Sequence, residues 1–110
     1  MGFFHHESDE AKAHDEVTNA PHKAELSHEL IAAAASYEAA KAYEKHCADN
    51  GKPESHAKAK ELLAGLAGAF IDRMVESKGL DYVDKEKAKH EAEKKNKQVF
   101  TADVYEEFDG

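Results

Sequence analysis

The feature that most constrains this chain is a long stretch, from His22 to Ala48, that contains neither glycine nor proline. The stretch is rich in alanine, the residue with the highest intrinsic helix propensity. It is followed by Asn50-Gly51 and then Pro53, an order typical of the carboxyl end of a helix. The sequence therefore predicts one long helix from about His22 to Ala48, with Pro21 in its first turn.

A second long helix is expected from about Glu54 to Lys78, ending at Gly79, because apolar residues recur there every three or four positions. Two long helices joined by a short turn form an antiparallel hairpin. Gly65 and Gly68 lie inside the second helix, where each costs about 1 kcal/mol relative to alanine. We expect them to be retained for close packing, against the alanine-rich surface of the first long helix or against a second copy of the chain.

Small side chains on the first long helix strengthen the expectation of self-association. Ala35 and Ala39 belong to a stripe of alanines at helical spacing, next to a separate apolar seam. The first long helix carries two apolar stripes, and the second long helix is apolar on two sides. Together they offer more apolar surface than one small hairpin covers. The sequence predicts a homo-oligomer whose interface includes Gly65, Gly68, Ala35 and Ala39.

Shorter helices are predicted on either side of the hairpin. Ser8 is placed to cap a helix from Asp9 to Thr18. A charged helix from Asp84 to Lys97 has only Ala88 and Ala92 to bury, so we expect it to pack weakly or to project. The predicted fold is all-α, a small antiparallel helical bundle built on a long helical hairpin.

The chain length of 110 residues fits one domain. We assign residues 1–98 to a single helical domain and residues 99–110 to an acidic, aromatic C-terminal tail. Phe100, Val104 and Phe108 recur every four residues in that tail. The tail could therefore form a last short helix that folds back on the bundle, or it could be only partly ordered, and both alternatives stay open.

Charge and hydropathy exclude several classes of partner. The chain has 23 acidic and 15 basic residues, a formal net charge of -8, which disfavours nucleic acid and anionic membrane surfaces. No apolar run is long enough to cross a bilayer, and no signal peptide is recognisable. Cys47 is the single cysteine, so no disulfide framework is expected. These features favour a cytoplasmic protein.

The motifs of the common enzyme classes are missing. The sequence has no nucleophile elbow, no phosphate-binding loop, no H-E-x-x-H and no dinucleotide-binding glycine motif. We predict no catalytic residue, and the composition leaves open whether the protein is an enzyme.

Histidine is unusually abundant, with eight copies, and it is the one residue type whose abundance indicates a possible metal or cofactor site. His46 and Cys47 end the first long helix and His56 begins the second, so the hairpin turn brings these possible ligands of a transition metal together. Against a metal site, the spacing matches no known zinc module, and a buried free cysteine is ordinary. The adjacent pair His5 and His6 is expected to be solvated.

Haem is a second open alternative. His22 and His28 flank the start of the first long helix, where an axial histidine could face an apolar pocket. The residues permit this arrangement without indicating it. No cofactor is predicted in the leading interpretation; haem or a transition metal belongs to the alternative.

Long runs of the sequence resemble a known family. The run from Asn19 to Ala32, the run from Ala34 to Glu44, and the Asn50–Pro53 corner are similar to the fungal CipC-like antibiotic response proteins, whose name stands for concanamycin-induced protein C. The resemblance implies a small cytosolic protein that rises under antibiotic or other stress. It supplies no catalytic residues.

Two functional hypotheses follow. The leading one is a non-enzymatic stress-responsive protein that acts through self-association or partner binding. The alternative is a haem- or metal-binding protein with oxidative, peroxidase-like activity. A small-molecule ligand also remains open, because a pocket between helices leaves no local motif.

Overall fold

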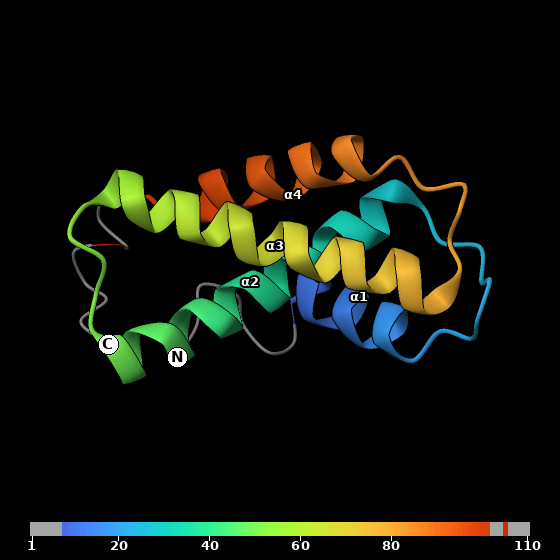
Figure 1. Ribbon diagram of the computed structural model, residues 1–110, viewed down its shortest axis with the longest axis horizontal. Coiled ribbons are helices and arrows are strands. Elements are labelled where there is room, and N and C mark those ends of the chain that lie inside the picture. Colours follow the sequence, from blue (N-terminus) through green and yellow to red (C-terminus); the bar gives the residue numbers. More distant parts are fainter. Residues whose placement is uncertain (1–7, 102–104, 106–110) are drawn as a thin grey trace.

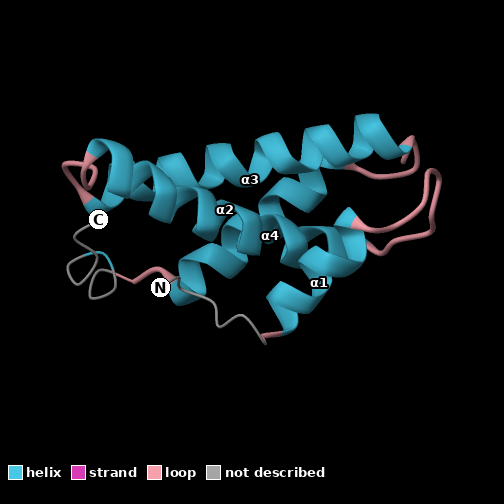
Figure 2. Ribbon diagram, turned by 90° about the horizontal axis from the view of Figure 1, so that it is seen from below, coloured by secondary structure: helices cyan, strands magenta, loops and turns pink. Residues whose placement is uncertain are grey.

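The computed structural model describes residues 8–101 and Tyr105, and this part of the chain contains four helices and no strand. They are α1 (Asp9–Thr18), α2 (His28–Asn50), α3 (His56–Lys78) and α4 (Lys85–Val99). Helix α2 packs against each of the other three helices, and α3 also packs against α4 (Figures 1 and 2). The predicted all-α bundle is confirmed.

Each helix begins at a side chain that caps it. Ser8, Ser27, Ser55 and Asp84 each accept a hydrogen bond from the backbone N–H three residues later. These bonds satisfy one of the donors that every helix leaves open at its start. The cap and both ends predicted for α1 are confirmed.

The predicted start of α2 at His22 is wrong, because the helix begins at His28. The backbone N–H of Lys23 instead donates to the carbonyl of Lys78 at 2.6 Å, and the N–H of Leu26 donates to the hydroxyl of Tyr82 at 2.5 Å. The loop between α1 and α2 and the loop between α3 and α4 lie at the same end of the bundle (Figure 1). These tertiary hydrogen bonds replace the intrahelical ones that a helix through residues 22–27 would make.

The hairpin itself is confirmed, since α2 and α3 pack against each other across the Asn50–Pro53 corner. Gly51 turns the chain there with φ of 84°, a left-handed conformation that favours glycine. Helix α3 begins at His56, two residues later than predicted, because Ser55 caps it. Its predicted end is confirmed: Gly79 follows with φ of 64°.

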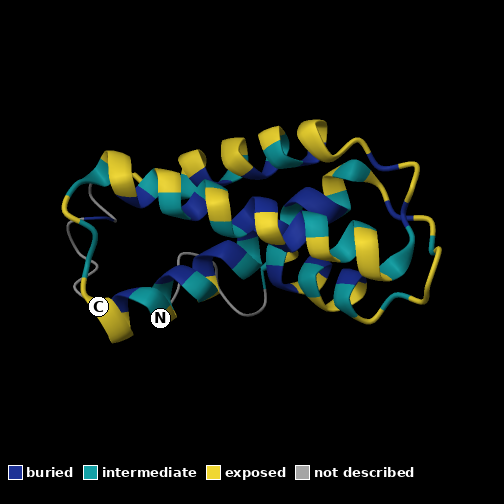
Figure 3. Ribbon diagram, viewed as in Figure 1, coloured by how far each residue is buried: buried dark blue, intermediate teal, exposed yellow. Residues whose placement is uncertain are grey.

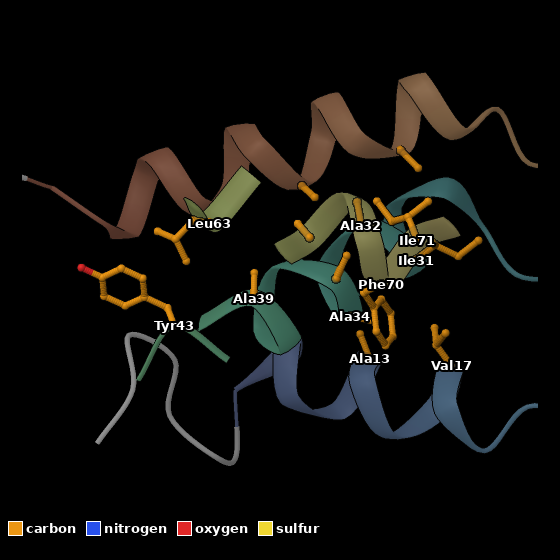
Figure 4. Packing of buried hydrophobic residues seen from close by; sticks show 14 of the residues in the cluster. Ala13, Val17, Ile31, Ala32, Ala34, Ala39, Tyr43, Leu63, Phe70 and Ile71 are labelled. Carbon is orange, nitrogen blue, oxygen red and sulfur yellow. The ribbon is translucent and has the colours of Figure 1, made fainter. Parts of the chain in front are cut away.

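Alanine is the commonest residue of the core. Figure 4 shows Ala32, Ala34 and Ala39 of α2 among larger side chains from the neighbouring helices, including Phe70 of α3. Alanines keep the side chains between the helices short, so the backbones approach closely. Phe70 also stacks on the ring of His14 from α1, with centroids 5.6 Å apart.

Helix α4 does not project. Its inner face buries Ala88, Ala92 and Asn96 against α2 and α3, while its outer face is exposed (Figure 3). Beyond α4, Phe100 is 1% exposed and Tyr105 also joins the core cluster. The division of the chain at residue 98 stays a prediction. Val104, Phe108 and the His5–His6 pair lie outside the described residues.

Across the described helices, none is long and apolar enough to span a membrane.

Candidate functional site

Cys47 lies in the core at the end of α2, with no exposed surface. Burial raises the pKa of its thiol and also raises the pKa of the neighbouring Tyr43 phenol, whose side chain hydrogen-bonds to Cys47. A raised pKa keeps the thiol neutral, whereas both metal ligation and nucleophilic attack need the thiolate. The environment of Cys47 is therefore that of a structural cysteine.

His56 contacts Phe100 and Tyr105, which follow α4 in the sequence. Its Nε2 lies 3.0 Å from the carbonyl oxygen of Phe100, close enough to donate a hydrogen bond, and its ring packs against the rings of Phe100 and Tyr105. The Tyr105 hydroxyl donates to the carbonyl of Pro53 at 2.5 Å, and the Lys52 ammonium lies 4.5 Å from the Tyr105 ring centroid. These contacts hold Phe100 and Tyr105 against the hairpin corner.

His46 is half-buried one residue before Cys47. Among residues 8–101 and Tyr105, no group of three or more His, Cys, Asp or Glu side chains is arranged to hold a metal ion. The metal site predicted at His46, Cys47 and His56 stays a prediction, and the contacts of Cys47 and His56 do not favour it.

His22 and His28 both lie against the loop between α3 and α4. Nε2 of His28 accepts a hydrogen bond from the backbone N–H of Asp84 at 3.0 Å. Nε2 of His22 lies so close to Gly79 that a Cβ added there would come within 2.8 Å of it. In this arrangement the His28 lone pair that an axial haem ligand would use is already engaged. Haem binding stays a prediction.

Of the four predicted interface residues, Ala35 and Ala39 are fully buried within the single chain. Gly68 is buried under the aliphatic part of Lys89 from α4 rather than under α2, and a Cβ added at Gly68 would lie 3.6 Å from that side chain. Gly65 is exposed and has open space where a Cβ would lie. The expected close packing of Gly65 against α2 is therefore wrong, and contact with a second copy stays a prediction.

A pocket of about 270 Å³ opens between the first half of α3 and the second half of α4. Its two buried lining residues are Leu63 and Asn96, which we call its floor. The remaining lining residues come from both helices and are Ala57, Lys60, Glu61, Ala64, Glu93 and Lys97. The two alanines of α3, Ala57 and Ala64, are too short to fill the space between the helices.

Asn96 is the unusual member of this lining. It is only 4% exposed, and within the described part of the chain neither its amide nitrogen nor its amide oxygen has a hydrogen-bond partner. Leaving such a buried group unsatisfied costs about 1–3 kcal/mol. Buried polar groups in native proteins are nearly always paired with protein or with ordered water, and both polar atoms of this amide are covered by the protein rather than open to the pocket. The candidate binding site is therefore the pocket beside the amide.

Sequence reasoning missed Asn96, although the signal was present. Ala88, Ala92 and Asn96 are four residues apart, so Asn96 continues the one buried stripe of α4 as its polar member. A polar residue at a core position of an otherwise regular stripe is the pattern that points to a site. The pocket itself could not be found this way, because its other wall comes from α3.

Comparison with known proteins gives one match. No curated protein and no solved structure is detectably similar to this chain. A family model described as virulence factor CipC-like matches residues 13–103, which include α2, α3, α4 and most of α1. The matched region spans most of the sequence and contains both the hairpin corner and the α3–α4 pocket. The chain therefore belongs to the virulence factor CipC-like family.

Proposed function

We propose that this protein serves a stress or antibiotic response by binding a partner molecule without transforming it, and that the α3–α4 pocket holds that molecule. Membership of the CipC-like family supports the response. The observation that carries the binding role is the pocket itself, a space of about 270 Å³ between α3 and α4 that the side chains leave unfilled. Pockets of this kind are where proteins usually hold small molecules.

The residues around the pocket support binding over catalysis. Neither Leu63 nor Asn96 on its floor can exchange a proton in the physiological range. Glu93 and Lys97 at the rim are about half-exposed and lie 3.7 Å apart as an ion pair. General acid–base chemistry is favoured by an ionisable group shielded from water, whereas Glu61, Glu93 and Lys97 are exposed and Lys60 is only partly buried.

Growth of a host strain that lacks its own copy tests the proposal. Concanamycin serves as the stress, and the strain receives the native gene or one of two matched variants. Ala57→Phe places a ring in the pocket wall at an exposed position of α3, and Ala69→Phe makes the same change at an exposed position outside the pocket. We expect the native chain and Ala69→Phe to restore growth equally and Ala57→Phe to fail, with both variants folded by circular dichroism.

Equal rescue by both variants would show that the pocket is not used. A second readout separates binding from catalysis: concanamycin incubated with purified protein should be recovered unchanged by mass spectrometry, and its conversion would contradict the non-enzymatic role. Sedimentation tests the self-association that the sequence predicts. A Soret band or stoichiometric metal in the purified protein would instead favour the haem- or metal-binding alternative.

A further inference from the structure

We infer that the α3–α4 pocket takes an uncharged, apolar group of the size of two fused aromatic rings, and that it makes no hydrogen bond to the buried end of that group. Polar substituents of such a ligand lie at the rim of the pocket, in water. The inference rests on the proposed function, since it names the class of ligand for the same pocket.

The dimensions of the pocket set the size of the ligand. A buried apolar cavity of about 150 Å³ holds one benzene ring. The pocket here, at about 270 Å³, is nearly twice as large. Its α3 wall runs from Ala57 to Ala64, a length of about 10 Å at the helical rise of about 1.5 Å per residue. This volume and length fit two fused rings, and a larger molecule can enter only through a part of that size.

The interior of the pocket presents mainly carbon atoms to a ligand. Ala57 and Ala64 contribute methyl groups, and Leu63, also in the lining, is 1% exposed. Asn96 lines the pocket too, but the protein covers both polar atoms of its side chain, so the amide is not available to a ligand. A polar group on the buried part of a ligand would therefore lose its hydration without finding a side-chain partner.

The same apolar interior disfavours ordered water. A buried water molecule is held well only where about two to four polar partners surround it, and the carbon-rich lining offers few. Water that a fused ring displaces from this space is weakly held, so its release favours binding. The ligand gains affinity from apolar contact rather than from directed hydrogen bonds.

The charges at the rim balance on each wall of the pocket. Helix α3 contributes Lys60 and Glu61, and helix α4 contributes Glu93 and Lys97. Glu93 and Lys97 lie 3.7 Å apart and pair with each other. Lys60 and Glu61 are adjacent in the sequence, so a charged ligand that approaches one of them also approaches the opposite charge. An ion gains little attraction there and loses part of its hydration on entry, which favours an uncharged ligand.

The test compares four probes that share one bicyclic shape and one point of substitution. Naphthylmethanol is neutral, naphthoate is anionic, naphthylmethylamine is cationic at neutral pH, and quinolinylmethanol carries a nitrogen in the ring far from its substituent. Binding to the native full-length chain is measured by calorimetry and by ligand-observed NMR. We expect naphthylmethanol to bind about fivefold more tightly than each of the other three, because each of them loses hydration that the pocket does not replace.

Two variants locate the binding in this pocket. Ala57→Phe fills the α3 wall, so it should weaken the binding of naphthylmethanol by at least about tenfold. Ala69→Phe makes the same change at an exposed position of α3 outside the pocket and should leave the binding unchanged. Equal effects of the two variants would overturn the assignment of the ligand to this pocket.

Glu61→Lys tests the charge balance independently, because it replaces a negative charge by a positive one at an exposed position of the rim. We expect naphthoate to bind about fivefold more tightly to this variant, naphthylmethylamine to bind correspondingly more weakly, and naphthylmethanol to be unaffected. Unchanged binding of naphthoate would overturn the explanation of why the pocket favours an uncharged ligand.

Two results with the native chain would overturn the inference directly. One is the failure of naphthylmethanol to bind, and the other is equal or tighter binding of any of the other three probes. The growth assay with Ala57→Phe judges the proposed function separately. If that variant fails to restore growth while naphthylmethanol does not bind, the pocket is used and only the class of ligand is wrong.

Discussion

Replacing Gly65 with alanine should stabilise the protein by about 1 kcal/mol. Gly65 lies in the middle of α3, is exposed, and has no atom within 4 Å of the position that a Cβ would take. Alanine is favoured over glycine in an exposed helix interior by about 0.8–1.0 kcal/mol, because the unfolded glycine chain has more conformational freedom to lose. No contact in the single chain opposes this gain.

This gain in stability is large enough to measure as a rise in the melting temperature. The unfolding entropy of a 110-residue domain is about 0.23 kcal/mol/K, so 1 kcal/mol raises the midpoint by about 4 °C. Calorimetry and urea unfolding at several protein concentrations should both show the shift. A lower midpoint for Gly65→Ala would refute the reasoning, since it would mean that some backbone or side chain approaches Gly65 closely, as the predicted contact with a second copy requires.

Gly79→Ala should have the opposite effect to Gly65→Ala and should lower the melting temperature. Gly79 adopts φ of 64°, and a Cβ there would lie 2.8 Å from Nε2 of His22. The left-handed conformation alone costs a non-glycine residue about 1–2 kcal/mol, so the midpoint should fall by about 4–8 °C. The exposed His22 side chain can move aside, so the backbone carries most of this cost.

The remaining predictions concern a buried thiol and two tyrosine hydroxyls. Because burial raises the pKa of the Cys47 thiol above its ordinary value of 9.0, the unfolded chain releases that proton first. Stability should therefore fall as the pH rises through this range, and Cys47→Ala should reduce the difference between urea midpoints at neutral pH and at about pH 9.5; an unchanged difference would contradict the assignment. Tyr82→Phe removes the hydroxyl that accepts from the N–H of Leu26 and lies 2.8 Å from its carbonyl, so it should cost about 1 kcal/mol and speed hydrogen exchange at residues 22–27. Exchange at the native rate would show that this loop is held by other contacts. Tyr105→Phe keeps the ring but loses the hydrogen bond to Pro53, so it should cost about 1 kcal/mol and speed proteolysis after residue 100; native-like proteolysis would show that this hydrogen bond does not hold Tyr105 in place.

Most helix boundaries could be read from the sequence because they depend on local chemistry. Ser8 caps α1 through its own side chain, and Gly79 ends α3 through its own backbone freedom. The start of α2 could not be read in this way, because Lys78 and Tyr82 compete for the backbone of residues 22–27 from more than fifty positions away. Local propensity carries no information about such partners.

The candidate site shows the same division. The sequence drew attention to the histidines and to Cys47, because these residue types can be recognised as possible ligands from the sequence alone. The structure uses His28, His56 and Cys47 as hydrogen-bonding or packing groups, and within the described residues it leaves the buried amide of Asn96 unpaired. A residue type indicates what chemistry is available, and only the neighbours determine whether that chemistry is already satisfied.

By itself, the sequence determined that this chain is a helical hairpin with short, alanine-rich contacts, because helix propensity, capping and the glycine–proline corner act within a few residues. The tertiary structure alone decided that α4 lies along α2 and α3, that Phe100 and Tyr105 lie against the hairpin corner, and that a pocket remains between α3 and α4. Burial and unpaired polar groups are properties of surfaces from different helices meeting in space, and no single segment encodes them.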